Sequence, residues 1–177
     1  MFTDFLIGFV VVVTVLLIVT FAMNIWLRIP SVPTPLPIVD EMVKLAKLKN
    51  DDRVFDIGAG DGRMLIAAKR ACGGIVAVGY EMIPTIWLIG KLRIFLSHTD
   101  VTLRRADALK QNYADADVIF LYLFPAFMEA LVEKFKTELR SGTRIVSYMF
   151  KLPHHEPIET KKVRGFWGEA TVYVYRW

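Results

Sequence analysis

The amino-acid sequence predicts an α/β protein, in which a mostly parallel, doubly wound sheet with one antiparallel strand at its edge follows a single apolar helix. Three observations predict this architecture. Short apolar runs typical of buried strands alternate with helical segments. A glycine-rich turn at residues 58–62 follows the first of these strands, and the chain closes with two strand-like segments in the pattern of a hairpin.

The first half of the folded part contains a covering helix and two strand–helix units. The covering helix is expected over Ile38–Lys49, because apolar residues recur there at mostly helical spacing before the turn at residues 50–52. The elements that follow are strands at 53–57, 75–81 and 101–105, with helices at 62–72 and 84–97 between them.

The second half begins with a central strand at 117–124, which we expect to be buried on both faces because its apolar run is continuous. Pro125 ends that strand, and a helix at 126–139 and a strand at 144–150 follow. The hairpin pairs 163–165 with 171–175 around a turn at 166–169. Only residues 152–158 separate it from the strand before, which is too short for a crossover helix, so we expect a trimmed version of the fold.

The N-terminal segment from Phe5 to Leu27 contains no charged residue and, at about 1.5 Å per residue, is long enough to cross a bilayer. We therefore expect a transmembrane anchor at 1–27, a proline-rich linker at 28–37 and one domain at 38–177. A cleaved signal peptide is disfavoured because Met1–Asp4 carries no positive charge, and a buried core helix is the remaining alternative.

The charges around this segment predict its orientation. Lys and Arg follow it and none precedes it, so the positive-inside rule places the N-terminus outside and the domain in the cytoplasm. A prokaryotic cytoplasmic membrane is favoured, with the mitochondrial inner membrane as the alternative. Four prolines within residues 29–37 make the linker stiff and keep the domain near the membrane, so the lipid bilayer is an expected partner.

The composition restricts which cofactors and partners the protein can have. One cysteine excludes an intrachain disulfide framework, and three scattered histidines offer no metal-ligand spacing, so no metal is expected. The net charge is +4, but the basic residues are spread along the chain. This spread indicates a solvated surface, and nucleic acid is not an expected partner.

The glycine-rich turn predicts the cofactor. Gly58, Gly60 and Gly62 occupy alternate positions, whereas a dinucleotide fold requires the pattern G-x-G-x-x-G. Asp56 before the turn and Asp61 within it would repel a pyrophosphate. Carboxylates around a bare glycine turn suit a cationic cofactor without phosphates, and S-adenosylmethionine has a sulfonium, an ammonium and an unphosphorylated adenosine. In such sheets this arrangement is typical of the class I methyltransferase architecture.

Polar residues at the ends of the strands should hold that cofactor, because ligands bind outside the carboxyl ends of parallel strands. Asp56 would bind the ammonium and Glu81 the ribose hydroxyls. Asp107 would accept from the adenine amine, although an Asp at this place is also a common turn former. Asp61 and Arg63 either tune the turn electrostatically or pair with each other at the surface. The remaining predicted cofactor contacts are Gly58, Ala59, Gly60 and Ala108.

The segment after the central strand bears on the methyl acceptor. Enzymes that methylate base amines in this fold often place Asn or Asp, two prolines and an aromatic residue there, whereas this chain has Tyr122-Leu123-Phe124-Pro125. An aromatic slot suits an alkyl amine. Tyr122 is the candidate catalytic residue, near the path by which the amine loses its proton, and a buried structural tyrosine is the alternative. Tyr148, Phe150 and Trp167 can line the same mouth.

With these motifs together, the chain resembles a known family. VFDIGAGDGR, VGYEM, FKLPHHEP and WGEATVYVY, preceded by an apolar segment and Val32-Pro33-Thr34-Pro35, are similar to the membrane-anchored protein-lysine methyltransferases that modify the c-ring protein of ATP synthase and the adenine nucleotide translocase, and to their prokaryotic relatives. The resemblance covers residues 31–177. It implies that Thr34 and Pro35 close over the cofactor, and that the substrate is a membrane or membrane-proximal protein.

Two other functions remain open at this point. The tether would equally favour methylation of a lipid or quinone headgroup. The chain could also keep the fold as a membrane-anchored interaction module without catalysis. The leading hypothesis is S-adenosylmethionine-dependent N-methylation of a protein lysine.

Overall fold

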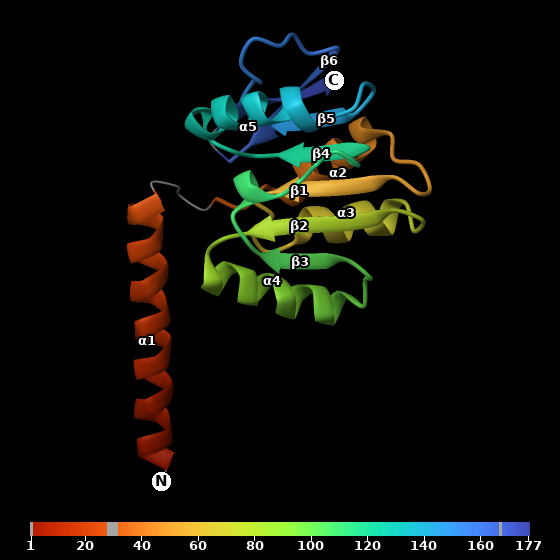
Figure 1. Cartoon of the computed structure of the whole chain (residues 1–177). Coiled ribbons are helices and arrows are strands. Elements are labelled where there is room, and N and C mark those ends of the chain that lie inside the picture. The colour runs from red at the N-terminus through yellow and green to blue at the C-terminus, as the bar shows by residue number, and fades with distance from the viewer. Residues whose placement is uncertain (1, 28–31, 167) are drawn as a thin grey trace.

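A seven-stranded sheet forms the centre of the computed structural model, which describes residues 2–27, 32–166 and 168–177 (Figure 1). The strand order is β3-β2-β1-β4-β5-β7-β6, and β1 to β5 run parallel. The strands are β1 Arg53–Ile57, β2 Val76–Glu81, β3 Thr102–Arg105, β4 Val118–Leu121, β5 Arg144–Tyr148, β6 Glu159–Gly165 and β7 Gly168–Arg176.

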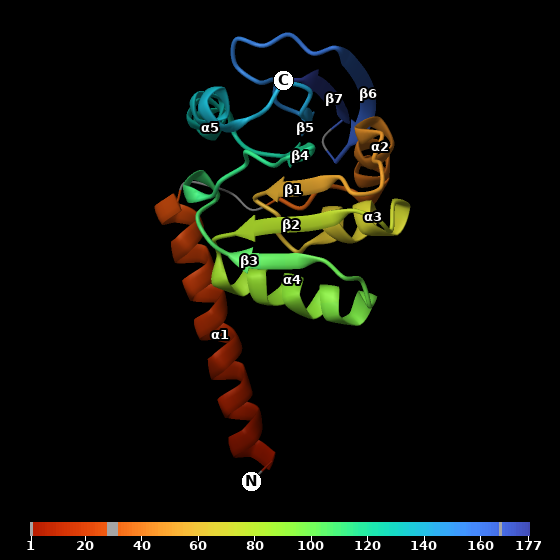
Figure 2. The ribbon, with the colours of Figure 1, turned by 45° about the vertical axis from the view of Figure 1, so that its right-hand side comes forward.

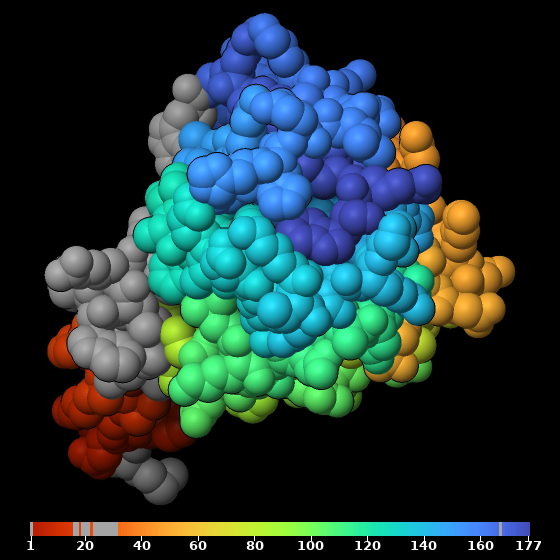
Figure 3. Space-filling view, turned by 45° about the horizontal axis from the view of Figure 1, so that its top comes forward, coloured from red at the N-terminus to blue at the C-terminus, as the bar shows by residue number. Residues whose placement is uncertain are grey.

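Helices cover both faces of this sheet (Figure 2). α2 Leu36–Ala46, α3 Arg63–Ala71 and α4 Pro84–Ser97 lie on one face, where their apolar residues form one core cluster with the sheet. α5 Pro125–Glu138 packs on the other face in a second cluster, and a short 3₁₀ helix, η1 Ala108–Lys110, follows β3. Figure 3 shows α5 in cyan and the C-terminal segments in blue forming one continuous surface on that side.

The position of the antiparallel strand differs from the prediction. β7 is antiparallel to β5, but it lies inside the sheet and β6 forms the edge. Burial explains the order, because β7 contributes Val172, Val174 and Tyr175 to the core, whereas β6 exposes most of its residues. A polar strand is suited to the edge of a sheet because its charged side chains discourage pairing with other chains.

Several predicted boundaries also shift: β5 ends at Tyr148, not at residue 150, and β6 begins at Glu159, not at residue 163. β4 ends at Leu121, not at residue 124, because the chain leaves the sheet and α5 begins at Pro125, a favoured first position of a helix. α2 begins at Leu36, inside the predicted linker, because Pro37 is tolerated in the first turn. Residues 122–124 therefore form a loop at the end of the central strand.

The predicted N-terminal helix is present as α1 Phe2–Leu27, and side chains are described for it at residues 2–15, 18 and 22. Counted over the part of the chain that the structure describes, no helix has the length and hydropathy needed to cross a membrane. The predicted transmembrane span is thus not found.

The strand order shows where on the sheet a ligand can bind. The chain leaves β1 toward β2 on one side and enters β4 on the other, so a crevice opens where the strand order reverses. The arrowheads of β1, β2 and β4 point toward the side of the molecule on which α1 stands (Figures 1 and 2).

Candidate active site

A pocket of about 410 Å³ opens at the carboxyl ends of β1, β2 and β4. A volume of this size accommodates a small organic ligand. It brings together the predicted residues Thr34, Asp56, Gly58, Ala59, Gly60, Asp61, Glu81, Asp107, Ala108 and Tyr122. Pro35 does not line it, because this residue caps α2 and its carbonyl accepts from the amides of Ile38 and Val39, both at 3.0 Å.

The glycine-rich turn forms the floor of the pocket. Its glycines at 58, 60 and 62 all have positive φ angles, of 77°, 55° and 75°. A left-handed conformation at alternate positions favours glycine strongly. A Cβ on Gly60 would meet no protein atom within 4 Å, so this backbone faces open space that a ligand can fill. The amides of Gly58 and Ala59 donate to the Tyr80 carbonyl at 3.1 and 2.9 Å, which fixes the turn on β2.

Asp56, the fourth residue of β1, is the most unusual group in the pocket. Its side chain is 7% exposed, and it has no hydrogen bond or ion pair with any residue that the structure describes. Burial, followed by the charges of Glu81 and Asp61, raises the pKa of Asp56 to about 8. An unpartnered buried carboxyl is costly for the fold, so a ligand that supplies a cation or a donor fits this position.

Glu81 at the end of β2 is held by backbone amides. Its Oε1 accepts from the amide of Ile83 at 2.8 Å and its Oε2 from Gly60 at 3.0 Å. Burial raises the pKa of Glu81 in spite of these bonds. A carboxylate has about four lone-pair sites, so a hydroxyl group of a ligand in the pocket can still donate to Glu81.

Asp61 and Arg63 pair with each other, as one of the two predicted alternatives states, and an electrostatic effect of the pair on the turn stays a prediction. The guanidinium donates from Nε to Oδ1 at 2.9 Å and from Nη2 to Oδ2 at 2.6 Å, and both side chains are mostly buried. Burial of Asp61 would raise its pKa, but the bonds and charges of Arg63 and Arg93 outweigh this and lower it. The pair is therefore not at the surface.

The same guanidinium reaches the N-terminal segment. Nη1 of Arg63 donates to the carbonyl of Thr34 at 2.7 Å, and Val32, Pro33 and Thr34 line the pocket. Arg63 thus ties segment 32–34 to the glycine turn. Arg63 stands two residues after Asp61, so the sequence suggests that pair. No sequence pattern predicts the bond from Arg63 to the carbonyl of Thr34, which lies 29 positions earlier.

Asp107 and Ala108 line the pocket on the side of β3. Oδ1 of Asp107 accepts from the amide of Leu109 at 3.0 Å, so this side chain caps η1. The turn-forming role is thus realised. Oδ2 lies 3.8 Å from Nζ of Lys110, and the predicted contact of Asp107 with adenine remains a prediction.

Aromatic rings form the opposite wall. Tyr122 lies 4.6 Å from Tyr148 and 6.4 Å from Phe150, and Phe124 lies 5.5 Å from Phe150, measured between ring centroids. Burial raises the pKa of Tyr122, and its hydroxyl donates to Sδ of Met149 at 3.9 Å. Tyr148, which is buried in the core, and Phe150 do not line the pocket, and Trp167 lies outside the described residues.

Several lining residues are absent from the sequence-based set. They are mainly apolar: Ile83, Ile86 and Ile89 around α4, and Phe127 in the first turn of α5. The apolar pattern of a helix marks them as candidates for the core, and only the packing of α4 and α5 beside the strand ends turns them toward a ligand.

The strand order and the pocket define the chain as a class I methyltransferase, and S-adenosylmethionine is its cofactor. Residues 56–159 match the family described as ANTKMT methyltransferase domain, and the chain belongs to that family.

Individual relatives agree with this assignment. The chain is 35% identical to a protein-lysine N-methyltransferase of Saccharolobus islandicus over 84% of its own length and 93% of that protein. It is 32% identical to the adenine nucleotide translocase lysine N-methyltransferase of Mus musculus, over 75% of this chain, and spans 58% of that longer protein.

A solved structure gives the same result for fold and cofactor. The crystal structure of an RNA methyltransferase from Salinibacter ruber in complex with S-adenosyl-L-homocysteine has a TM-score of 0.76 and is 32% identical. The match covers 82% of this chain and 93% of that one.

Proposed function

We propose that this methyltransferase transfers a methyl group to the side-chain amine of a protein lysine. The observation that carries the proposal is the aromatic wall beside the cofactor pocket, where Tyr122 and Phe124 follow β4 in place of an amide or carboxylate. A nucleobase amine would lack its hydrogen-bond partner at that place. An alkyl chain ending in an amine fits between ring faces. The lysine methyltransferases among the relatives support the same acceptor.

The residues present fit S-adenosylmethionine. The unpartnered carboxyl of Asp56 suits the ammonium, the free lone pairs of Glu81 suit the ribose, and the open space at Gly60 leaves room for the ligand against the backbone. When bound, S-adenosylmethionine supplies an electrophilic methyl group. Bringing Asp56 next to an ammonium favours its ionised form, so binding near neutral pH should release a proton from the pocket.

The acceptor must be a neutral amine, although the pKa of a free lysine is about 10.4. An apolar, aromatic surrounding lowers the pKa of an amine because it disfavours the charged form. Tyr122 and Phe124 supply that surrounding. We therefore assign Tyr122 the role of orienting the acceptor, with its ring as a wall of the pocket.

We further propose that the acceptor belongs to a membrane or membrane-proximal protein and that α1 attaches the enzyme to a bilayer. Support comes from the exposed apolar residues of α1, and from relatives named after the adenine nucleotide translocase and the c-ring protein of ATP synthase. The excess of Lys and Arg after α1 supports a cytoplasmic position of the domain. Protease digestion of sealed vesicles tests this orientation, since a cytoplasmic domain is cut only from that side.

Transfer of a radioactive methyl group tests the acceptor. The full chain is incubated with methyl-labelled cofactor and a membrane fraction, which is then separated into protein, lipid and RNA. We expect label in a protein band, and mass spectrometry should place it on lysine. Label in the lipid extract would support the headgroup alternative, and label in RNA would overturn the proposal. Asp56→Asn is the control that removes cofactor-dependent label.

A further inference from the structure

Helix α4 has an unusual composition for a covering helix. Its buried side consists of Gly90 and Ile94, with Trp87 packed against the core. The opposite side is also apolar: Leu88, Leu92, Phe95 and Leu96 are 55–73% exposed there, and Ile89, 56% exposed, lies at its border toward the cofactor pocket. A helix that is apolar all round is normally buried on all sides or lies against a membrane. We call Leu88, Leu92, Phe95 and Leu96 the outer face of α4.

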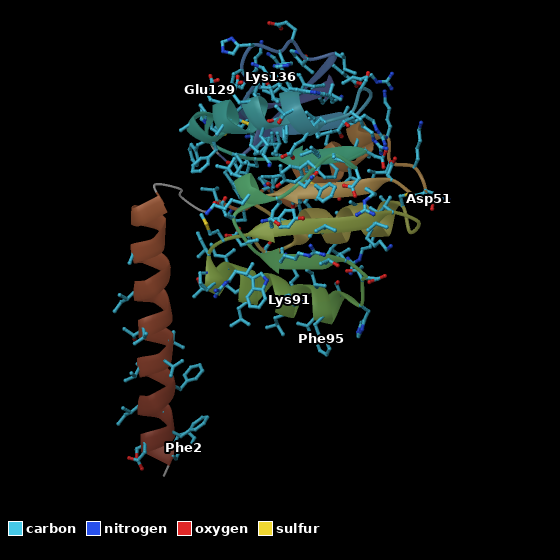
Figure 4. All side chains as sticks on the ribbon, viewed as in Figure 1. Phe2, Asp51, Lys91, Phe95, Glu129 and Lys136 are labelled. Carbon is cyan, nitrogen blue, oxygen red and sulfur yellow. The ribbon has the colours of Figure 1, made fainter. Side chains whose placement is uncertain are left out.

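The spacing of the outer face makes it continuous. Residues at positions i, i+4, i+7 and i+8 lie on one side of a helix, and Leu88, Leu92, Phe95 and Leu96 have this spacing. At 100° per residue, Lys91 and Arg93 fall at its two borders, and α4 carries no acidic residue. Arg93 also pairs with Asp61 at 3.1 Å, whereas Lys91 is exposed and points away from the sheet, as does Phe95 (Figure 4).

The position of α1 indicates what covers this face. α1 contacts α4, and in Figures 1 and 2 its N-terminal part extends past α4, away from the sheet. The described side chains of that part are largely apolar and exposed, from Phe2 to Val15. A bilayer that received this end of α1 would have its surface against the outer face of α4.

We propose that the outer face of α4 docks on the surface of the lipid bilayer. Its apolar side chains enter the boundary between headgroups and acyl chains, while Lys91 at the border extends to anionic headgroups. This goes beyond the attachment of α1, because it gives the catalytic domain a second contact and a fixed orientation. It does not depend on lysine being the acceptor.

The docked orientation would place the active site at a set distance from the lipid. Ile86 and Ile89 of α4 line the cofactor pocket. A Cβ on Gly90 would stand 3.1 Å from the carbonyl oxygen of Gly60 and 3.2 Å from the carbonyl carbon of Asp61, so α4 packs directly on the glycine turn. One helix therefore joins the proposed lipid contact to the cofactor site.

Site-directed fluorescence tests the docking with the full chain. In a Cys72→Ser background, an environment-sensitive probe is attached at Leu92→Cys or Phe95→Cys on α4, or at Lys136→Cys as a matched control on α5. Lys136 lies at the opposite end of the molecule (Figure 4). The protein is reconstituted into vesicles of phosphatidylcholine and phosphatidylglycerol without any other protein. Quenching by spin-labelled lipid and by aqueous iodide is then compared.

At positions 92 and 95 we expect blue-shifted emission and lipid quenching about threefold or more above that at position 136, with iodide showing the reverse order. Equal behaviour at the three positions would overturn the proposal. So would a shift on α4 that appears only when a membrane protein is added, because a protein would then be the partner. A shift that depends on the ratio of protein to lipid would indicate a second copy of the chain and would also overturn it.

A double variant separates docking from folding. With the probe at Leu88→Cys, Leu92→Glu combined with Phe95→Glu should reduce lipid quenching to near the level of the α5 control, while Lys136→Glu should leave it unchanged. Binding of S-adenosylhomocysteine should stay within about twofold in both variants, since neither 92 nor 95 lines the pocket. Unchanged lipid quenching in a double variant that still binds this ligand would contradict the proposal. This readout is independent of methyl transfer, so failure of the proposed function would not affect it.

Discussion

The two walls of the pocket differ in chemistry and in origin. The cofactor wall is polar and comes from one short stretch, residues 56–63, together with Glu81 on the neighbouring strand. The acceptor wall is aromatic and comes from the loop after β4 and the first turn of α5, with Phe150 after β5 packed against Tyr122 and Phe124. The difference teaches that charge for a cationic cofactor can be encoded in one local motif, whereas a slot for an alkyl amine has to be assembled from separate parts of the chain.

The largest expected effect comes from Asp56→Asn. Loss of the carboxylate should weaken binding of S-adenosylhomocysteine roughly 100-fold, because a charge-assisted bond to the ligand's ammonium in a buried site is lost. Titration calorimetry measures this. Asp51→Asn, at an exposed turn position, is the matched control and should bind normally. Comparable affinity in the two variants would show that Asp56 does not hold the cofactor.

The acceptor wall should respond in a different way. Tyr122→Ala should lower kcat/KM for a lysine-containing substrate about 10- to 30-fold while changing cofactor affinity less than about threefold, because the ring orients the acceptor. Tyr122→Phe keeps the ring and should retain most of the activity. Methyl transfer at varied substrate concentration measures the effect. If Tyr122→Phe loses as much as Tyr122→Ala, the hydroxyl is required and the role as a wall is wrong.

A substitution of Arg63, which joins segment 32–34 to the glycine turn, should have an intermediate effect on cofactor binding. Arg63→Lys keeps the charge but loses the planar fork that holds both Asp61 and the Thr34 carbonyl. We expect cofactor affinity to fall about fivefold and limited proteolysis near Thr34 to become faster. Lys69→Arg, on the same helix and outside the pocket lining, is the control. Unchanged proteolysis would mean that segment 32–34 is held by other contacts.

The smallest expected effect is on the pH dependence of thermal stability. The carboxyl of Asp56 has a pKa of 3.8 as its ordinary value and about 8 in the fold, so between these values the folded state binds more protons than the unfolded state. Stability conferred by the protonated form is complete below pH 3.8 and is lost as the pH rises to about 8. Asp56→Asn should therefore raise the Tm at pH 9 by roughly 5 °C, a few kcal/mol at most, and by less at pH 5.

Thermal unfolding at both pH values checks this expectation. Burial also raises the pKa of Glu81, so part of the pH dependence should persist in the variant. An Asp56→Asn protein no more stable than the wild type at pH 9 would show that the carboxyl finds a partner in solution.

The sequence specifies the cofactor wall well because its determinants are local. Glycines at alternate positions are needed where φ is positive, and a carboxylate that ends a parallel strand reaches the crevice whatever the rest of the chain does. Asp56, Gly58, Gly60 and Glu81 were therefore predicted and lie in the pocket. Pro35 was predicted only by resemblance, and it caps a helix instead.

Other features depend on contacts between distant segments, and sequence patterns do not report them. The interior place of β7 follows from the burial of its apolar face against β5, and the bond from Arg63 to Thr34 follows from how segment 32–34 crosses the turn. The apolar residues of α4 look alike in the sequence, yet packing on β3 and the glycine turn buries one side and leaves five residues exposed.

The sequence by itself determined the α/β class, the order of elements and the cationic cofactor, because periodicity, glycine conformations and strand-end charges act over a few residues. Only the tertiary structure decided the strand order at the C-terminal edge, which of the aromatic residues line the pocket, and the exposed face of α4. These depend on which surfaces meet, and the free energy of burying one surface against another belongs to the pair and cannot be read from either segment alone.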